Sequence, residues 1–411
     1  MNFSTSTARI LPLPNGERVG VRGPRTKSLQ YAPPHPRRSK ALRRDLSPLG
    51  RGLRSVVVLA FVLLSSSTIA AHAEADHAAI AKASLEQYIR PGYAQFAQST
   101  DALKQSVTTL CGKPSPAALK DTQKAFAATV EAWSVVEPIR FGPVAQEHRF
   151  ERIFYWPDPK GLGTRQIRDA IAKQDKSVTE QTGLIGKSVA LQGLPALEYL
   201  FYGDSAATLE KGGAEGTFRC SFAEAVAGNL AGMAKEIVDG WRDGAPYTKS
   251  YLEPGPANAA YHTPKEVTLE LFKTFNAGIE WVRDQKLAKT LGAKPEQARP
   301  QLAPFWRSGL SFANMAGNLA GVRDLFAKGG FAQVVHQESA GVEDSVVFDL
   351  DHAIEVLRGM DKPIADAVRD EELRGKLEAL RISLKAASTT AGDMISKGAG
   401  LSFGFNAMDG D

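Results

Sequence analysis

Apolar residues recur every three or four positions through most of the chain after residue 77. This spacing places them on one side of an α-helix, whereas a half-buried strand would alternate strictly, and no segment bounded by turn residues does so. The pattern therefore predicts an all-α fold built from packed bundles. Long helices are expected over residues 78–110, 116–136, 179–202, 218–241, 264–291, 302–327, 341–357 and 362–396.

A proline-rich segment divides this helical pattern into two parts. Residues 243–264 contain four prolines, which are strong interruptions of helix. We therefore expect two similar, four-helix-type bundles packed together. The first would span residues 74–243, the second residues 264–411, and a linker at 244–263 would join them.

A short sequence occurs once in each predicted half. Ala-Gly-Asn-Leu-Ala-Gly spans residues 227–232 and recurs at 316–321, each time a few residues after a phenylalanine. Duplication of an ancestral bundle would leave such a repeat. Two unrelated helices that use Ala and Gly for close packing would produce it as well, and the sequence leaves both interpretations open.

Basic residues are concentrated before residue 74. The 411-residue chain has a formal charge of +5 and a pI of about 9.0. Residues 1–73 hold 12 Lys and Arg against 2 Asp and Glu, while the rest of the chain holds 38 against 43. The larger part is therefore mildly acidic, and neither its charge nor its motifs favour a nucleic-acid partner.

The basic segment has the features of a secretory leader. Residues 56–64 form a short apolar run with arginines before it, and Ala71-His72-Ala73 supplies a cleavage signature. The run is about half as long as a membrane-spanning helix, which needs ~20 residues. We expect residues 1–73 to be an N-terminal extension and signal peptide, with an uncleaved signal anchor as the alternative. No membrane span is expected after cleavage.

The two cysteines, Cys111 and Cys220, both follow the leader. An oxidising compartment permits one disulfide between them, and two buried thiols are the alternative. Neither cysteine stands at the predicted cleavage site, so a lipid anchor is not expected.

Aromatic residues and arginines are unusually dense in residues 137–158. The segment holds five Phe, Tyr and Trp residues together with three arginines, among them Arg140 and Arg149. Prolines prevent it from forming one continuous helix. Such a connection inside a bundle is typical of a lid or a site wall, where Arg beside aromatic rings suits recognition of a carboxylate. Alternatively, the arginines pair with carboxylates of neighbouring helices.

The segment 191–203 carries a carboxylate at the edge of an apolar stripe. Glu198 lies four residues after Leu194, and Tyr202 follows one turn later. A buried carboxylate must be paired, protonated or bound to metal. Glu198 is therefore a candidate for a polar site, and a structural salt bridge is the alternative.

Two histidines are followed by glutamate three residues later, a spacing that puts both side chains on one face of a helix. The pairs are His148–Glu151 and His352–Glu355. His352 and Glu355 are the weak candidates for metal ligation, and a solvated helix face is the alternative interpretation for each pair.

Three segments together resemble the imelysin family of bacterial periplasmic proteins, in its iron-regulated-protein-like branch. They are Trp133 with residues 140–143, the run 154–158, and residues 193–203, which read Gly-Leu-Pro-Ala-Leu-Glu-Tyr-Leu-Phe-Tyr-Gly. The resemblance implies a periplasmic protein linked to iron or metal acquisition, or a metal-dependent peptidase.

The resemblance also implies a G-x-H-x-x-E motif, which aligns with Gly193, Pro195 and Glu198. The position of the histidine is therefore occupied by proline, which has no ligand atom. We expect a binding or accessory protein more than an enzyme. The alternative is an imelysin-type peptidase in which other His and carboxylate side chains hold the metal.

The expected site is a polar cleft near the junction of the two bundles, with no catalytic residue assigned. Its ligand would be an unidentified small molecule or a periplasmic or outer-membrane uptake partner, and only the resemblance implies iron or another divalent metal. The binding candidates are Arg140, Arg149, Glu198, Tyr199 and Tyr202 from the first half, and Trp306, Arg307 and Asn318 from the second.

Overall fold

The computed structural model describes residues 75–401, and all of them belong to one compact unit. Helices supply the regular secondary structure, and no strand occurs within this range, so the all-α prediction is confirmed. The predicted leader and its cleavage signature lie outside the described residues.

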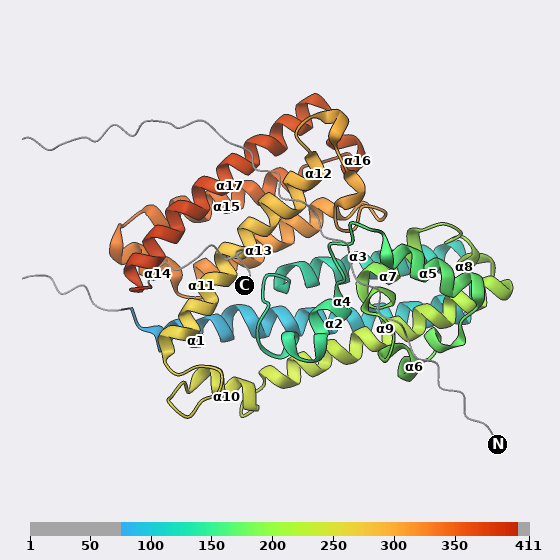
Figure 1. Ribbon diagram of the computed structural model, residues 1–411, viewed down its shortest axis with the longest axis horizontal. Helices are drawn as coiled ribbons and strands as arrows, with labels where there is room; N and C mark the ends of the chain where they lie inside the picture. Colours follow the sequence, from blue (N-terminus) through green and yellow to red (C-terminus); the bar gives the residue numbers. More distant parts are fainter. Residues whose placement is uncertain (1–74, 402–411) are drawn as a thin grey trace, which may run out of the picture. The chain divides into compact units, whose positions relative to one another are not determined.

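A long, nearly continuous helical segment runs through the first group of helices (Figure 1). This segment comprises α1 (His77–Ser84), a π-helical turn (Leu85–Ile89) and α2 (Arg90–Gly112). α2 packs against both α3 (Pro116–Val136) and α9 (Gly213–Trp241). The fully buried residues Tyr93, Phe96 and Leu103 of α2 recur at helical spacing, so the periodicity in the sequence corresponds to the face that α2 buries.

Side chains cap the starts of the helices α1 and α3. The Asp76 carboxylate accepts a hydrogen bond from the Ala79 N–H at 2.9 Å, and the Ser115 hydroxyl accepts one from the Ala118 N–H at 3.2 Å. Each bond satisfies an N–H that has no partner inside its helix. Local sequence therefore fixes both starts.

The second group of helices is drawn in yellow to red in Figure 1. α13 packs against α11 and α15, and α17 packs against α11, α14 and α15. The elements are α11 (Pro264–Glu280) with its continuation in a π-helical turn (Trp281–Ala288) and α12 (Lys289–Leu291), α13 (Ser311–Lys328), α14 (Phe331–Glu338), α15 (Val342–Arg358), α16 (Ile364–Ala367) and α17 (Glu371–Gly398).

The two groups meet where α13 packs against α3. A Cβ on Gly321 would lie 2.0 Å from the Val135 carbonyl oxygen, and a Cβ on Gly317 would lie 2.5 Å from the Ser134 Cβ. Only glycine permits so close an approach of the two backbones. The second Ala-Gly-Asn-Leu-Ala-Gly copy therefore serves close packing. In the first copy, a Cβ on Gly228 would lie 3.4 Å from its nearest neighbour, the Gln181 side-chain oxygen, so close packing does not require glycine there.

Short helices and turns connect the long elements of the first group. The helices are α4 (Arg149–Ile153), α5 (Leu162–Lys173), α6 (Gln181–Ile185), α7 (Gly193–Tyr202), α8 (Thr208–Lys211) and α10 (Pro246–Leu252), with 3-10 turns at Gly142–His148, Lys176–Val178 and Val189–Leu191. Two further 3-10 turns, Pro295–Gln297 and Pro300–Leu302, precede α13.

Three of the predicted long helices are wrong in extent. Residues 362–396 hold α16 and the start and body of α17, because Asp370 has an extended backbone and its carboxylate caps a new helix start. Residues 179–202 hold α6, a turn and α7 in place of one helix, because Gly193 has φ +69° and interrupts the helical backbone. The helix expected from residue 302 begins at Ser311, because Phe305 and Gly309 have φ values of +53° and +76°. The turn at residues 303–310 carries part of the site described below.

The predicted disulfide is confirmed. Cys111, at the end of α2, bonds to Cys220 in α9, with the two Cα atoms 5.4 Å apart. The bond closes a loop with a sequence separation of 109 residues. A closed loop of that length stabilises the fold by about 4–5 kcal/mol in the chain-entropy account.

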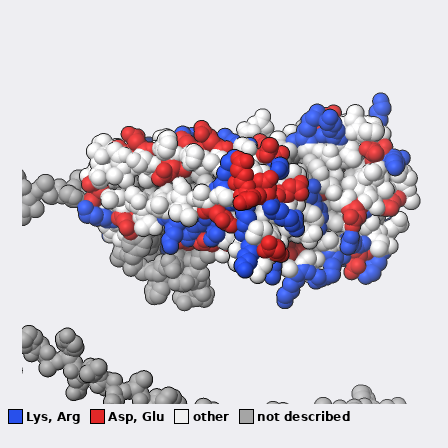
Figure 2. Space-filling model, turned by 90° about the horizontal axis from the view of Figure 1, so that it is seen from above, with Lys and Arg blue, Asp and Glu red and all other residues white. Residues whose placement is uncertain are grey.

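The described surface carries charges of both signs. Figure 2 shows one face, on which Asp and Glu side chains gather near the middle and Lys and Arg side chains border them. Within residues 75–401, no helix combines the length and the apolar character needed to cross a bilayer.

Candidate functional site

A cavity of about 380 Å³ lies between the first group of helices and the turn that precedes α13. We call it the junction cavity. Its walls come from the segment after α4, the start of α5, one face of α7 and residues 301–307. The lining includes Phe154, Trp156, Lys160, Arg165, Pro195, Glu198, Tyr199, Phe305, Trp306 and Arg307.

Glu198 is the buried acid of the junction cavity, with 4% of its surface exposed. One of its carboxylate oxygens accepts hydrogen bonds from the Ser308 N–H at 2.9 Å and from the Ser308 hydroxyl at 2.8 Å. Burial raises the pKa of the Glu198 carboxyl, while the Ser308 bonds and the Arg307 charge act in the opposite direction. The carboxyl is thus held by neutral donors at the wall of an open cavity.

The start of α7 accounts for the residue types at positions 193 and 195, which are glycine and proline. A Cβ on Gly193 would lie 2.2 Å from the Ile153 carbonyl oxygen, so only glycine lets α7 begin against the end of α4. Pro195 is the third residue of α7, where a backbone N–H would have no intrahelical partner. Because Pro195 and Glu198 are three residues apart, they share a face of α7, and both line the junction cavity.

The Arg307 guanidinium lies over two aromatic rings of the cavity wall. Its central carbon is 4.4 Å from the Trp306 ring centroid and 5.4 Å from that of Tyr199. It donates a hydrogen bond to the Thr164 hydroxyl at 2.8 Å, and Arg168 donates one to the Tyr199 hydroxyl at 3.1 Å. These contacts hold a cation and two aromatic rings in fixed positions beside Glu198.

Asp158 also lines the cavity, but its carboxylate already serves the fold. Its two oxygens accept hydrogen bonds from the Leu162 and Gly163 N–H groups, both at 2.8 Å, and thereby cap the start of α5. Lys160 and Arg165 add two further cationic side chains to the lining. The charged side chains of the lining are therefore three cations and two carboxylates, and of the cations Arg307 acts on the buried Glu198.

The remaining binding candidates lie outside the junction cavity. Arg149 is buried and donates to Glu236 at 2.8 Å and to the Pro143 carbonyl at 3.2 Å. The Tyr202 hydroxyl donates to the Gln123 carbonyl at 3.2 Å, and burial raises the pKa of Tyr202 to about 12. Arg140 and Asn318 line a second cavity, described below.

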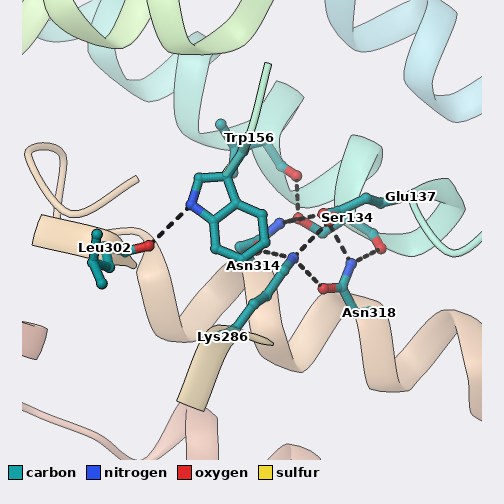
Figure 3. A network of polar contacts seen from close by, with 8 residues as sticks. Ser134, Glu137, Trp156, Lys286, Leu302, Asn314 and Asn318 are labelled. Atoms are coloured by element: carbon teal, nitrogen blue, oxygen red, sulfur yellow. Dashed lines mark hydrogen bonds and ion pairs between the residues drawn. The ribbon is translucent and has the colours of Figure 1, made fainter. Parts of the chain in front are cut away.

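A buried polar network joins the two helix groups behind Phe154 and Trp156, two aromatic residues that line the junction cavity (Figure 3). The Lys286 ammonium donates to Glu137 at 2.6 Å, to Asn314 at 2.6 Å and to Asn318 at 2.5 Å. The Asn314 amide donates in turn to the Ser134 hydroxyl at 2.7 Å. Burial lowers the pKa of Lys286 to about 8, and the Glu137 charge opposes that change.

Sequence reasoning missed most of this network. Asn318 was a candidate, but Glu137, Lys286 and Asn314 were not. One available signal was the position of Lys286, four residues after the buried Val282 and hence on the same apolar face. Lys286 is also 5.5 Å from the Trp156 ring centroid, while Trp156 itself donates to the Leu302 carbonyl at 3.0 Å. The network therefore lies directly behind the junction cavity.

The weak metal candidates lie apart from the junction cavity and from the buried network around Lys286. His352 and Glu355 are exposed on α15, and the His352 ring stacks on the exposed Phe348 with centroids 6.3 Å apart. Neither lines the junction cavity. Within residues 75–401, no group of three or more His, Cys, Asp and Glu side chains is arranged to hold a metal ion.

Comparison with known proteins gives a consistent result. The family model described as Imelysin matches residues 89–390. An imelysin-like protein from Psychrobacter arcticum 273-4 has a similar structure, with a TM-score of 0.66 at 18% identity over 80% of this chain and 97% of that one.

A second solved structure is described as an iron-regulated protein A precursor from Parabacteroides distasonis ATCC 8503. It gives a TM-score of 0.63 at 13% identity over 78% of this chain and 95% of that one. At these identities the two structures establish a shared fold. No curated protein matches the chain.

Proposed function

Because the chain belongs to the imelysin family, we propose that it is an exported, periplasmic binding or accessory protein that serves iron or metal acquisition through its junction cavity. The ligand would be polar and would contact Glu198 and Arg307. The proposal differs from the alternative, an imelysin-type peptidase, in assigning the cavity to recognition and not to hydrolysis.

The observation that carries the proposal is Pro195. It occupies the histidine position of the motif and lines the junction cavity beside Glu198. A catalytic zinc site needs three protein ligands and an open position for water. Glu198 supplies one such ligand, and the cationic Lys160, Arg165 and Arg307 would repel a bare metal ion. A metal would therefore arrive already chelated, or an organic anion would be the ligand.

Two further observations support export and a link to iron. The Cys111–Cys220 disulfide is the kind of bond that persists in oxidising compartments such as the periplasm. The structural neighbour from Parabacteroides distasonis is described as an iron-regulated precursor. The proposal extends both properties to this chain.

The test measures the metal content of the purified protein and of a variant in which histidine replaces Pro195. Purified protein is dialysed against Zn²⁺ or Fe²⁺, desalted and analysed for metal, beside the variants Pro195→His, Glu198→Ala and His352→Ala. We expect no stoichiometric metal in the unaltered protein and in His352→Ala. We expect a gain of zinc affinity in Pro195→His, because histidine would then stand three residues before Glu198 on one helix face.

Two outcomes would contradict the proposal. Stoichiometric zinc or iron in the unaltered protein that is lost in Glu198→Ala would show that the cavity ligates metal directly. Cleavage of unstructured peptide substrates that is lost in the same variant would favour the peptidase.

A further inference from the structure

A second cavity, of about 320 Å³, lies along α11 and shares no lining residue with the junction cavity. Glu137 and Asn318 of the buried network form part of its wall, and Arg140 and Trp281 line it as well. We call it the Arg140 cavity. The proposed function makes no use of it.

Arg140 is held in this cavity by aromatic contacts alone. Its guanidinium lies 4.1 Å from the ring centroid of Phe150 and 4.5 Å from that of Trp281. Such contacts fix the group without using its N–H donors. Among the residues that the structure describes, no carboxylate lies within ion-pair distance of Arg140, and no acceptor takes a hydrogen bond from it.

Trp281 contributes its ring to the cavity wall and not its N–H donor. The indole nitrogen is enclosed by protein, whereas the ring lies against the Arg140 guanidinium. The Arg140 side chain is exposed, so its N–H donors are accessible to a ligand in the cavity.

The carboxylates near the cavity do not compete strongly for Arg140. Glu137 already accepts hydrogen bonds from Lys286, Asn314 and Asn318. Glu151 attracts Arg140 electrostatically but is exposed, so solvent and salt screen it.

Glu270 also lines the cavity, but at a distance from the Arg140 end. It precedes Trp281 by eleven residues, which corresponds to about 16 Å along the helix axis. The exposed Lys273, three residues after Glu270, offsets the charge of that carboxylate. Within residues 75–401, Arg140 thus keeps its charge without a carboxylate at ion-pair distance.

We propose that the Arg140 cavity binds a small organic carboxylate, whose oxygens accept hydrogen bonds from the Arg140 guanidinium. The planar fork of arginine matches a carboxylate in shape and charge. The apolar wall formed by Pro138 and Ala277 suits the hydrocarbon part of such a molecule better than it suits inorganic phosphate.

The experiment is calorimetric titration of the purified chain at low salt with acetate, hexanoate and benzoate. Benzamide serves as the neutral counterpart of benzoate, and inorganic phosphate as the second anion. We expect at least one carboxylate to bind, with benzamide and phosphate at least ten-fold weaker. Absence of binding by all three carboxylates, or tighter binding of phosphate, would overturn the proposal.

Variants locate the binding. Arg140→Lys keeps a cation over the rings but loses the planar fork, and Arg140→Gln loses the charge as well. We expect carboxylate binding to weaken by about ten-fold in Arg140→Lys and by more in Arg140→Gln, from the loss of charge-assisted hydrogen bonds. If one variant fails to fold, judged by circular dichroism, the other decides.

Arg242→Lys is the matched control, because Arg242 is an exposed arginine that lines neither cavity. It should leave carboxylate affinity within two-fold. Equal weakening by Arg242→Lys, or no weakening by Arg140→Lys and Arg140→Gln, would place the binding elsewhere and overturn the assignment. Since this assay involves neither metal nor Glu198, its result is independent of the metal test of the junction cavity.

Discussion

Glu137 and Glu198 are both buried carboxylates of the first helix group, and both contact residues of the second. Glu137 meets the Lys286 ammonium at 2.6 Å and two asparagine amides, so its charge is compensated within the protein. Glu198 meets the N–H and hydroxyl of Ser308 and faces the junction cavity. The first arrangement closes an interface, whereas the second leaves a carboxyl group available to a ligand.

The difference has a simple physical basis. A buried ion pair is costly to disrupt, because removal of one partner leaves an uncompensated charge in a medium of low dielectric constant. A carboxyl group held by neutral donors at a cavity wall can exchange its proton or its partners at lower cost. We therefore assign Glu137 to the stability of the junction and Glu198 to recognition.

Removal of the Lys286 side chain should produce the largest effect. In Lys286→Ala, Glu137, Asn314 and Asn318 would lose the donor that they share, and the free energy of unfolding should fall by about 3–5 kcal/mol. Urea unfolding measures the change. The exposed Lys289 is the matched control, since Lys289→Ala should alter stability by less than about 0.5 kcal/mol. A loss below about 1 kcal/mol in Lys286→Ala would break the comparison.

The pH dependence of stability should reveal the same lysine. The pKa of Lys286 falls from 10.5 to about 8 on folding. Above pH 8 the folded protein releases this proton while the unfolded chain keeps it, so stability should rise with pH in this window, by on the order of 2 kcal/mol.

Unfolding should be measured between pH 7.5 and 9.5, because the buried tyrosines, whose pKa values burial raises, reverse the trend at higher pH. In Lys286→Met the rise should disappear, while Lys289→Ala should keep it. An identical rise in Lys286→Met would assign the effect to another group.

Removal of the Ser308 hydroxyl should have a moderate effect. Ser308→Ala keeps the backbone donor to Glu198 but loses the side-chain donor, which should cost about 1 kcal/mol. The pKa of the Glu198 carboxyl should rise further, because hydrogen bonds to the charged form have been lost. Thermal unfolding and carboxyl titration by NMR check the two changes. An unchanged Glu198 pKa would show that the hydroxyl is not a partner in solution.

The smallest effect on stability is expected for Glu198→Gln. The amide oxygen can still accept both Ser308 hydrogen bonds, so the free energy of unfolding should change by less than about 1 kcal/mol. Glu137→Gln is the direct counterpart, and it should cost about 3 kcal/mol because it leaves Lys286 without its counter-charge. Equal losses in the two variants would show that Glu198 is structural and would weaken its role in recognition.

The site could be predicted from the sequence only in part. Glu198 stood out because a carboxylate at the edge of an apolar stripe requires an explanation, and it does line the cavity. Arg149 stood out as an arginine among aromatic residues, yet it pairs with Glu236, which was the alternative interpretation of that segment. Ser308 could not be found, because the pattern placed it inside a helix that begins only at Ser311.

By itself the sequence determined the properties that depend on neighbours along the chain. Helical periodicity and capping residues such as Ser115 follow from local spacing. The sequence allowed a disulfide or two buried thiols, and the fold brings Cys111 and Cys220 together across 109 residues. The tertiary structure decided which polar groups meet. Lys286 and Glu137 are 149 residues apart, and Ser308 and Glu198 are 110 apart. No periodicity encodes such pairings. The first depends on how closely α3 and α13 approach at Gly317 and Gly321, and the second on the turn that brings Ser308 to α7.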